Sequence, residues 1–154
     1  MATSHTVIQT ASPEETEHIA RVFASRLRGG EVIELVSDLG GGKTTFTRGL
    51  VAGLGSHDHV ASPTFTISRE YSGGQLYVYH FDFYRLPEPG VIADELAEVI
   101  GDPKSVVVVE WADIVHDVLP EDRVRIEITV TGETARELDI TYPETLRYLV
   151  ENLH

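Results

Sequence analysis

The stretch SDLGGGKT, residues 37–44, lies between an apolar run at 32–36 and a stretch at 45–54 with helical periodicity. It follows the pattern G-x-x-x-x-G-K-[ST], in which backbone N–H groups surround phosphate oxygens at the start of a helix. One position departs from the pattern, because Ser37 stands where glycine is usual. The sequence therefore predicts a strand over 31–36, a phosphate-binding loop, and a helix over 43–54.

Each part of this loop has a chemical task in binding a nucleoside triphosphate. The glycines at 40–42 let consecutive N–H groups point inward, Lys43 can reach the outer phosphates, and the Thr44 hydroxyl is a ligand for Mg²⁺. We predict these nucleotide-binding residues in the loop: Asp38, Leu39, Gly40, Gly41, Gly42, Lys43, Thr44 and Thr45.

The serine at position 37 does not exclude phosphate binding. The first glycine of the pattern serves the turn out of the strand, so serine costs about 1 kcal/mol if its φ is positive and almost nothing otherwise. The alternative is a glycine-rich turn without a ligand. Three glycines followed by Lys43 and Thr44 at a helix start would be a poor sequence for stability alone, so we favour the phosphate-binding loop.

Two acidic residues close apolar runs and are candidates for a magnesium site. Glu110 follows the run 105–109, and Asp82 follows the run 77–81. If both runs are strands parallel to 31–36, both acids emerge at the same sheet edge as the loop. Carboxylates there bind Mg²⁺, directly or through water, or orient an attacking water. We predict Lys43, Asp82 and Glu110 as catalytic residues and Thr44, Asp82 and Glu110 as the metal site, and leave open which acid positions the water.

The rest of the chain predicts an α/β domain. Ser12-Pro13-Glu14-Glu15 has the form of an N-cap, a first-turn proline and a capping-box glutamate, while Gly73-Gly74 and Gly132 mark two hairpin turns. We predict helices over 12–28, 92–100 and 143–149, a strand over 105–109, and strand pairs 65–71 with 75–81 and 124–130 with 137–141. We expect one domain over residues 1–154, a three-layer P-loop NTPase-like domain with a mixed parallel and antiparallel sheet.

The composition restricts the partners and the compartment. The 12 Lys and Arg against 25 Asp and Glu give a net charge of -13, which repels nucleic acid, so we expect RNA to be reached only through a protein partner. The absence of cysteine excludes disulfides and thiolate metal sites. No stretch approaches the ~20 apolar residues of a membrane helix, and the start lacks a leader pattern. We expect a cytoplasmic protein, without membrane association, that is a monomer when alone.

The nucleotide is predicted to be ATP. Selection of guanine in P-loop proteins uses an Asn-Lys-x-Asp or Thr-Lys-x-Asp box, whereas the one asparagine here is Asn152 and neither Lys43 nor Lys104 lies in such a box. A small-molecule kinase would need a lid with clustered arginines over the transferred phosphate. The arginines of this chain are scattered, which disfavours a kinase.

Four segments taken in order resemble the bacterial TsaE (YjeE) family. They are SDLGGGKTTFTRGL (37–50), SPTFT (62–66), YHFDFYRL (79–86) and VVVVEW (106–111). The resemblance spans residues 13–111. This family is the ATPase component of the machinery that makes threonylcarbamoyladenosine beside the tRNA anticodon.

The resemblance implies a protein that binds and hydrolyses ATP with Mg²⁺, weakly when alone, and that acts with TsaB and TsaD, so that tRNA is met only through the complex. A non-catalytic ATP-dependent clamp and a small-molecule P-loop kinase remain as alternatives. By position, the resemblance implies that Gly40, Gly41, Gly42 and Lys43 hold the phosphates, that Thr44 and Glu110 are Mg²⁺ ligands, and that Asp82 lies near the ion and water.

Two further assignments come from the resemblance alone. Ser62, Pro63 and Thr64 match a switch-like segment of the family, and Thr16 matches a first-helix position near the nucleotide base. The segment 88–100 does not match the usual helix of the family between the Tyr-Arg and Glu-Trp motifs. The surface that faces a partner protein is therefore not predicted.

Overall fold

The computed structural model describes residues 2–37, 42–56, 68–73, 75–84 and 90–154. The strands in these residues are β1 (Thr3–Thr10), β2 (Val32–Val36), β3 (Ser68–Gly73), β4 (Leu76–Asp82), β5 (Ser105–Glu110), β6 (Val124–Val130) and β7 (Arg136–Pro143). The α-helices are α1 (Pro13–Ser25), α2 (Lys43–Gly53), α3 (Gly90–Val99) and α4 (Arg147–Val150), and two short 3-10 helices are η1 (Ala112–Val115) and η2 (Glu144–Leu146).

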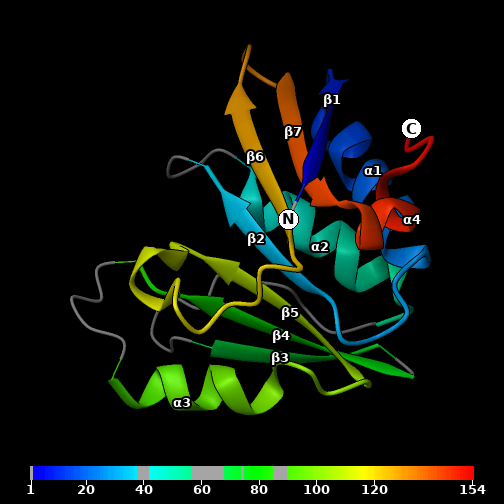
Figure 1. Cartoon of the computed structure of the whole chain (residues 1–154). Helices are drawn as coiled ribbons and strands as arrows, with labels where there is room; N and C mark the ends of the chain where they lie inside the picture. Colours follow the sequence, from blue (N-terminus) through cyan, green and yellow to red (C-terminus); the bar gives the residue numbers. More distant parts are fainter. Residues whose placement is uncertain (1, 38–41, 57–67, 74, 85–89) are drawn as a thin grey trace.

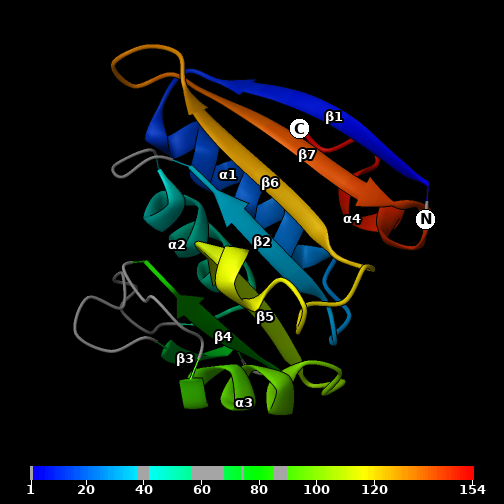
Figure 2. The same cartoon turned by 60° about the vertical axis from the view of Figure 1, so that its left-hand side comes forward.

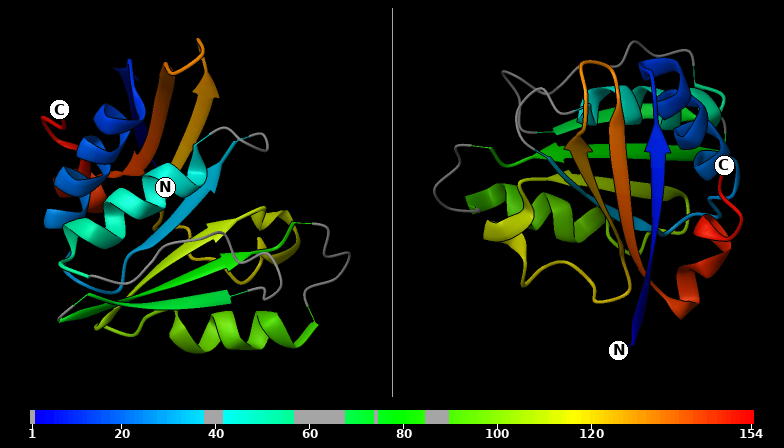
Figure 3. Two further views of the ribbon diagram at one scale, coloured as in Figure 1. Left: turned by 180° about the vertical axis from the view of Figure 1, so that it is seen from behind. Right: turned by 90° about the horizontal axis from the view of Figure 1, so that it is seen from above.

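The strands form one sheet in the order β1-β7-β6-β2-β5-β4-β3 (Figure 1). The centre is parallel, because β2 pairs in parallel with β5 and β6, and β4 pairs in parallel with β5. The hairpins β3–β4 and β6–β7 are antiparallel, as is β1 against β7. The sheet twists strongly, so that β6, β7 and β1 cross the direction of β3 and β4 (Figure 3). The prediction of an α/β fold with a mixed sheet is confirmed.

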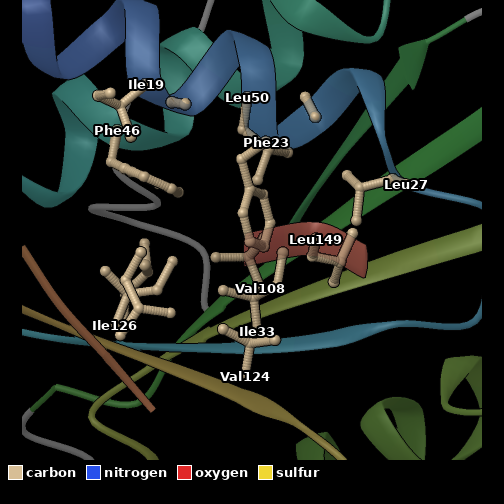
Figure 4. Packing of buried hydrophobic residues seen from close by; sticks show 14 of the residues in the cluster. Ile19, Phe23, Leu27, Ile33, Phe46, Leu50, Val108, Val124, Ile126 and Leu149 are labelled. Carbon is tan, nitrogen blue, oxygen red and sulfur yellow. The ribbon is translucent and has the colours of Figure 1, made fainter. Parts of the chain in front are cut away.

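Helices cover both faces of the sheet. Figure 2 shows α1 behind β6 and β2, on the face away from α3. On the α1 and α2 side, Phe23 and Phe46 meet edge to face with ring centroids 6.1 Å apart, above Ile33 and Val108 of the sheet (Figure 4). On the α3 side, Leu96 packs in a second cluster with residues of β4, β5 and η1. Because β5 is covered on both faces, its valines are all buried, as expected for a central parallel strand.

The predicted start of α1 is confirmed in detail. Ser12 is the N-cap, and its side chain accepts a hydrogen bond from the Glu15 backbone N–H. Glu15 reaches back and accepts from the Ala11 backbone N–H rather than that of Ser12. The helix ends at Ser25 instead of continuing to residue 28, because Glu31 accepts hydrogen bonds from the N–H groups of Arg28 and Gly29 and holds them in the turn before β2.

Other boundaries differ from the predictions. The predicted helix over 143–149 is wrong in its first turns: Pro143 closes β7, residues 144–146 form η2, and α4 covers only Arg147–Val150. The strand β1 is an addition, since no element was predicted before residue 12. In the first hairpin, β3 is described from Ser68 onward, and residues 65–67 of the predicted strand lie outside the described residues. The pairing of β3 with β4 runs from Ser68↔Phe81 to Gly73↔Leu76. Among the helices of the described residues, none is long and apolar enough to cross a membrane.

Candidate active site

The N-terminus of α2 has the backbone geometry of an anion site. Its N-cap is Gly42, whose φ of 110° lies in the left-handed region that favours glycine, and no side chain caps the helix there. The first-turn N–H groups of an α-helix have no partner within the helix, and the helix dipole favours negative charge at this end. Because β2 ends at Val36 and α2 begins at Lys43, the strand–loop–helix order is as predicted.

Ser37 does not strain the loop. Among the described non-glycine residues, only Trp111 and Asn152 have positive φ. The backbone carbonyl of Ser37 accepts a hydrogen bond from Lys43 Nζ at 3.2 Å. Residue 37 therefore contributes its backbone carbonyl as an acceptor, in a conformation that serine adopts without steric strain.

Lys43 is buried next to Glu110, the last residue of β5. Its ammonium lies 3.6 Å from Glu110 Oε1 and 4.5 Å from the centroid of the Trp111 ring. Lys43 is 8% exposed and Glu110 2% exposed, so water screens this pair only weakly. Trp111 turns the chain with φ 55° and ψ 54°, and its ring also packs on Tyr84.

Asp82 lies beside Glu110 in the register of the parallel strands. The pair Asp82↔Glu110 joins β4 to β5, and Leu35↔Glu110 joins β5 to β2, so the two acids leave the sheet at the edge that also carries the loop. Burial raises the pKa of Asp82 above its ordinary value, and the nearby Glu110 carboxylate adds to this, although the Tyr84 N–H donates a hydrogen bond to Asp82 Oδ1 at 2.9 Å.

A pocket next to Gly42 brings together elements that are far apart in the sequence. It is lined by Pro13, Thr16, Gly42, Thr45, Thr134 and Arg136. The Thr16 hydroxyl is hydrogen-bonded to that of Thr10 at 2.7 Å, which fixes its place on α1. Arg136 is held by its own turn, because its guanidinium donates to the carbonyls of Gly132 and Ala135 at 3.2 and 2.8 Å.

The sequence did not indicate Thr134 and Arg136, which belong to the end of the β6–β7 hairpin. No motif marks them, because they reach the loop only through the strand order that places β6 beside β2. These two residues could be found only from the pairing of strands. If 124–130 is parallel to 31–36, the hairpin turn that follows 124–130 lies at the same end of the sheet as the phosphate-binding loop.

The structure brings the predicted site residues that it describes to one edge of the sheet. Lys43, Glu110 and Asp82 lie around the N-terminus of α2, where Thr44 is the second residue of the helix. Thr16 and Thr45 line the adjoining pocket. The other predicted residues, Asp38, Leu39, Gly40, Gly41, Ser62, Pro63 and Thr64, lie outside the described residues.

The donor set fits magnesium on a nucleotide rather than a protein-only metal cage. In the described part of the chain, no group of three or more His, Cys, Asp or Glu side chains could hold a metal ion. Mg²⁺ in phosphoryl-transfer sites keeps several waters and takes phosphate oxygens with only one or two carboxylates. One hydroxyl, from Thr44, and the buried carboxylate of Glu110 near the N-terminus of α2 are the residues that would hold such an ion.

Comparison with known proteins gives a consistent result. A family model described as "Threonylcarbamoyl adenosine biosynthesis protein TsaE" matches residues 10–138. The chain is 41% identical over 133 residues to a Bacillus subtilis protein named tRNA threonylcarbamoyladenosine biosynthesis protein TsaE, covering 86% of this chain and 83% of that one. A Streptomyces coelicolor protein of the same name is 40% identical over 123 residues, which is 78% of this chain and 83% of the relative.

A solved structure shares the fold. The crystal structure of Bacillus subtilis YdiB superposes with a TM-score of 0.79 at 37% sequence identity, covering 99% of this chain and 96% of that one. The agreement therefore includes β1 and the C-terminal residues, which lie outside the family match at 10–138.

Proposed function

Because the chain belongs to the TsaE family, we propose that it binds ATP with Mg²⁺ at the loop before α2 and hydrolyses it in support of tRNA threonylcarbamoyladenosine formation. One observation carries the proposal. Lys43 and the buried Glu110 lie 3.6 Å apart at the N-terminus of α2, with Asp82 paired beside Glu110. A buried cation at a helix N-terminus suits a phosphate chain, and the two acids suit its magnesium ion and the attacking water.

The nucleotide would lie across the N-terminus of α2. The first-turn N–H groups and Lys43 would bind the phosphates, where the ammonium exchanges its contact with the Ser37 carbonyl for phosphate oxygens. The pocket lined by Thr16, Thr45 and Arg136 adjoins the helix start and would take the nucleoside end. This agrees with the place near the base that the family resemblance implies for Thr16.

Four polar side chains would share three tasks in hydrolysis. When bound, Mg²⁺ supplies positive charge that stabilises the phosphate oxygens during transfer. Glu110 and the Thr44 hydroxyl would hold it, and Lys43 would stabilise charge that develops on the transferred phosphate. Asp82 would orient the attacking water. Its raised pKa makes it a better proton acceptor than an ordinary aspartate.

The proposed ATPase would act in support of a protein complex. The family resemblance supports TsaB and TsaD as the partners, with tRNA met only through them. The net charge of -13 supports the second point, because the chain alone would repel the tRNA backbone.

The direct test of the site is ATP titration calorimetry with Lys43→Ala. A charge-assisted hydrogen bond is worth roughly 1.5 to 3 kcal/mol, so affinity should fall about tenfold to a hundredfold. Lys104→Ala is the matched control, because Lys104 is exposed and is the one other lysine of the sequence. Unchanged affinity in Lys43→Ala, or an equal loss in both variants, would contradict the phosphate assignment.

A further inference from the structure

His80 is a buried histidine beside the candidate magnesium ligand. It lies on β4 two residues before Asp82, and since side chains alternate along a strand, His80 and Asp82 share the face that carries Lys43. His80 is 1% exposed. Its Nε2 lies 2.5 Å from Glu110 Oε2, and among the described residues its Nδ1 has no hydrogen-bond partner.

The contacts of Glu110 decide which nitrogen of His80 carries the proton. The Lys43 ammonium lies 3.6 Å from Glu110 Oε1 and forms an ion pair with this carboxylate. A carboxylate only accepts hydrogen bonds, so His80 Nε2 must donate. Nε2–H is present in one neutral tautomer of imidazole and also in the protonated ring, so the donor assignment rests on the contact geometry alone.

The two oxygens of Glu110 therefore have different environments. Oε2 contacts His80 Nε2, and Oε1 faces the Lys43 ammonium at the N-terminus of α2. We propose that His80 is a positioning residue: its Nε2–H holds Glu110 Oε2 so that Oε1 alone is presented to Mg²⁺ and the phosphates. This inference rests on the proposed function, because it assigns the orientation of a ligand within that site.

A purely structural role for His80 is the competing explanation. In that explanation the buried ring only fills space, and any side chain of similar volume would serve. The positioning role needs a donor at the place of Nε2. Ligands of metal ions are commonly oriented by such hydrogen bonds, and loss of the partner typically costs 10–100-fold in metal affinity or activity.

Three substitutions separate the two explanations. In His80→Gln the amide nitrogen lies about as far from the backbone as Nε2 and can donate to Glu110. In His80→Asn the amide is about one bond shorter and falls short of it, and in His80→Leu the donor is absent while most of the volume is kept. The readout is ATP affinity by calorimetry with Mg²⁺ and with chelator, together with the melting temperature of the nucleotide-free protein.

Mg²⁺ should raise ATP affinity about tenfold less in His80→Leu and His80→Asn than in the unsubstituted protein. Their ATP affinity in chelator should be nearly unchanged. His80→Gln should keep most of the gain. If His80→Leu does not fold, the comparison of Gln with Asn decides. Equal gains in Gln and Asn would overturn the positioning role, as would a loss that appears equally in chelator. If Lys43→Ala binds ATP like the unsubstituted protein, the failure belongs to the proposed function instead.

Discussion

At the scale of single residues, Asp82 lies in surroundings that oppose its own charge. Burial raises its pKa above the ordinary 3.8, so the folded protein holds the proton more tightly than the unfolded chain does. The ionised form therefore lowers stability above the folded pKa, and this cost vanishes once the pH falls below the unfolded value. A residue kept in spite of such a cost is a candidate for chemistry.

Asp82→Asn should melt at the same or a higher temperature than the unsubstituted protein at pH 7, while ATP turnover falls. The difference in melting temperature should shrink as the pH approaches 4, and calorimetric scans across pH measure it. Asp102→Asn is a control of opposite sign, because hydrogen bonds from the Lys104 N–H and the Ser105 hydroxyl lower the pKa of Asp102, and it should lose stability at pH 7. A clear drop in melting temperature for Asp82→Asn would contradict the assignment.

Glu110→Gln should separate the metal ligand from the water-orienting acid. The amide is a weaker Mg²⁺ ligand, so Glu110→Gln should lose metal-dependent ATP affinity, whereas Asp82→Asn should lose turnover with binding nearly kept. Because the two acids are register partners, the double variant should be non-additive. Normal MgATP binding and turnover in Glu110→Gln would leave the magnesium role to Asp82.

Ser37→Gly restores the full loop pattern and should change little. The serine φ is not positive and its carbonyl already accepts from Lys43, so ATP affinity should move by less than about threefold. Titration calorimetry with ATP measures this variant and Lys43→Ala under the same conditions, so their affinities can be compared directly. A much larger gain would mean that the loop of the natural sequence is badly formed.

At the scale of elements, α1 and α2 pack closely through glycine. A Cβ added at Gly49 would lie 2.5 Å from the Glu17 carbonyl oxygen and 2.8 Å from Ala20 Cβ. Gly53 makes a similar approach to Arg21 and Ala24. This packing sets the distance between Thr16 on α1 and the loop at the start of α2.

Gly49→Ala should therefore destabilise the protein, although alanine favours a helix by about 1 kcal/mol over glycine. Overlap with a backbone carbonyl forces a helix shift, and overpacking typically costs about 1–3 kcal/mol. Urea unfolding measures the result. The exposed Ala52→Gly on the same helix is the control for helix propensity alone, and it should cost about 1 kcal/mol. Greater stability in Gly49→Ala would show that the helices are not constrained by this contact.

Elements with strong local signals were predictable, and those that depend on pairing were not. The Ser12 cap, the apolar run of β5 and the β6–β7 hairpin appear where their sequences indicate. The strand β1 is exposed along most of its length, and its two apolar residues, Val7 and Ile8, are adjacent. Its sequence therefore shows no apolar alternation, and the strand forms because β7 offers an edge. The C-terminal helix was overextended because Pro143, read as a first-turn residue, ends a strand.

At the scale of the whole molecule, the strand order makes the site. Parallel pairing of β2, β4 and β5 gathers Lys43, Asp82 and Glu110 at one edge, which the sequence predicted from apolar runs that end in acids. The hydrogen bond from His80 to Glu110 was not predictable, because it depends on register between two strands. Nor was the place of Arg136, which reaches the loop through the position of β6 next to β2.

The central claim is that this chain is an ATPase that acts with partner proteins. The most direct measurement is the rate of phosphate release from MgATP under three conditions. They are the chain alone, the chain with TsaB and TsaD, and the Lys43→Ala variant with TsaB and TsaD. The account predicts slow release alone, clear stimulation by the pair, and loss of that stimulation in Lys43→Ala. Threonylcarbamoyladenosine formation supported equally well by a non-hydrolysable ATP analogue, with no stimulated phosphate release, would contradict it and favour the clamp.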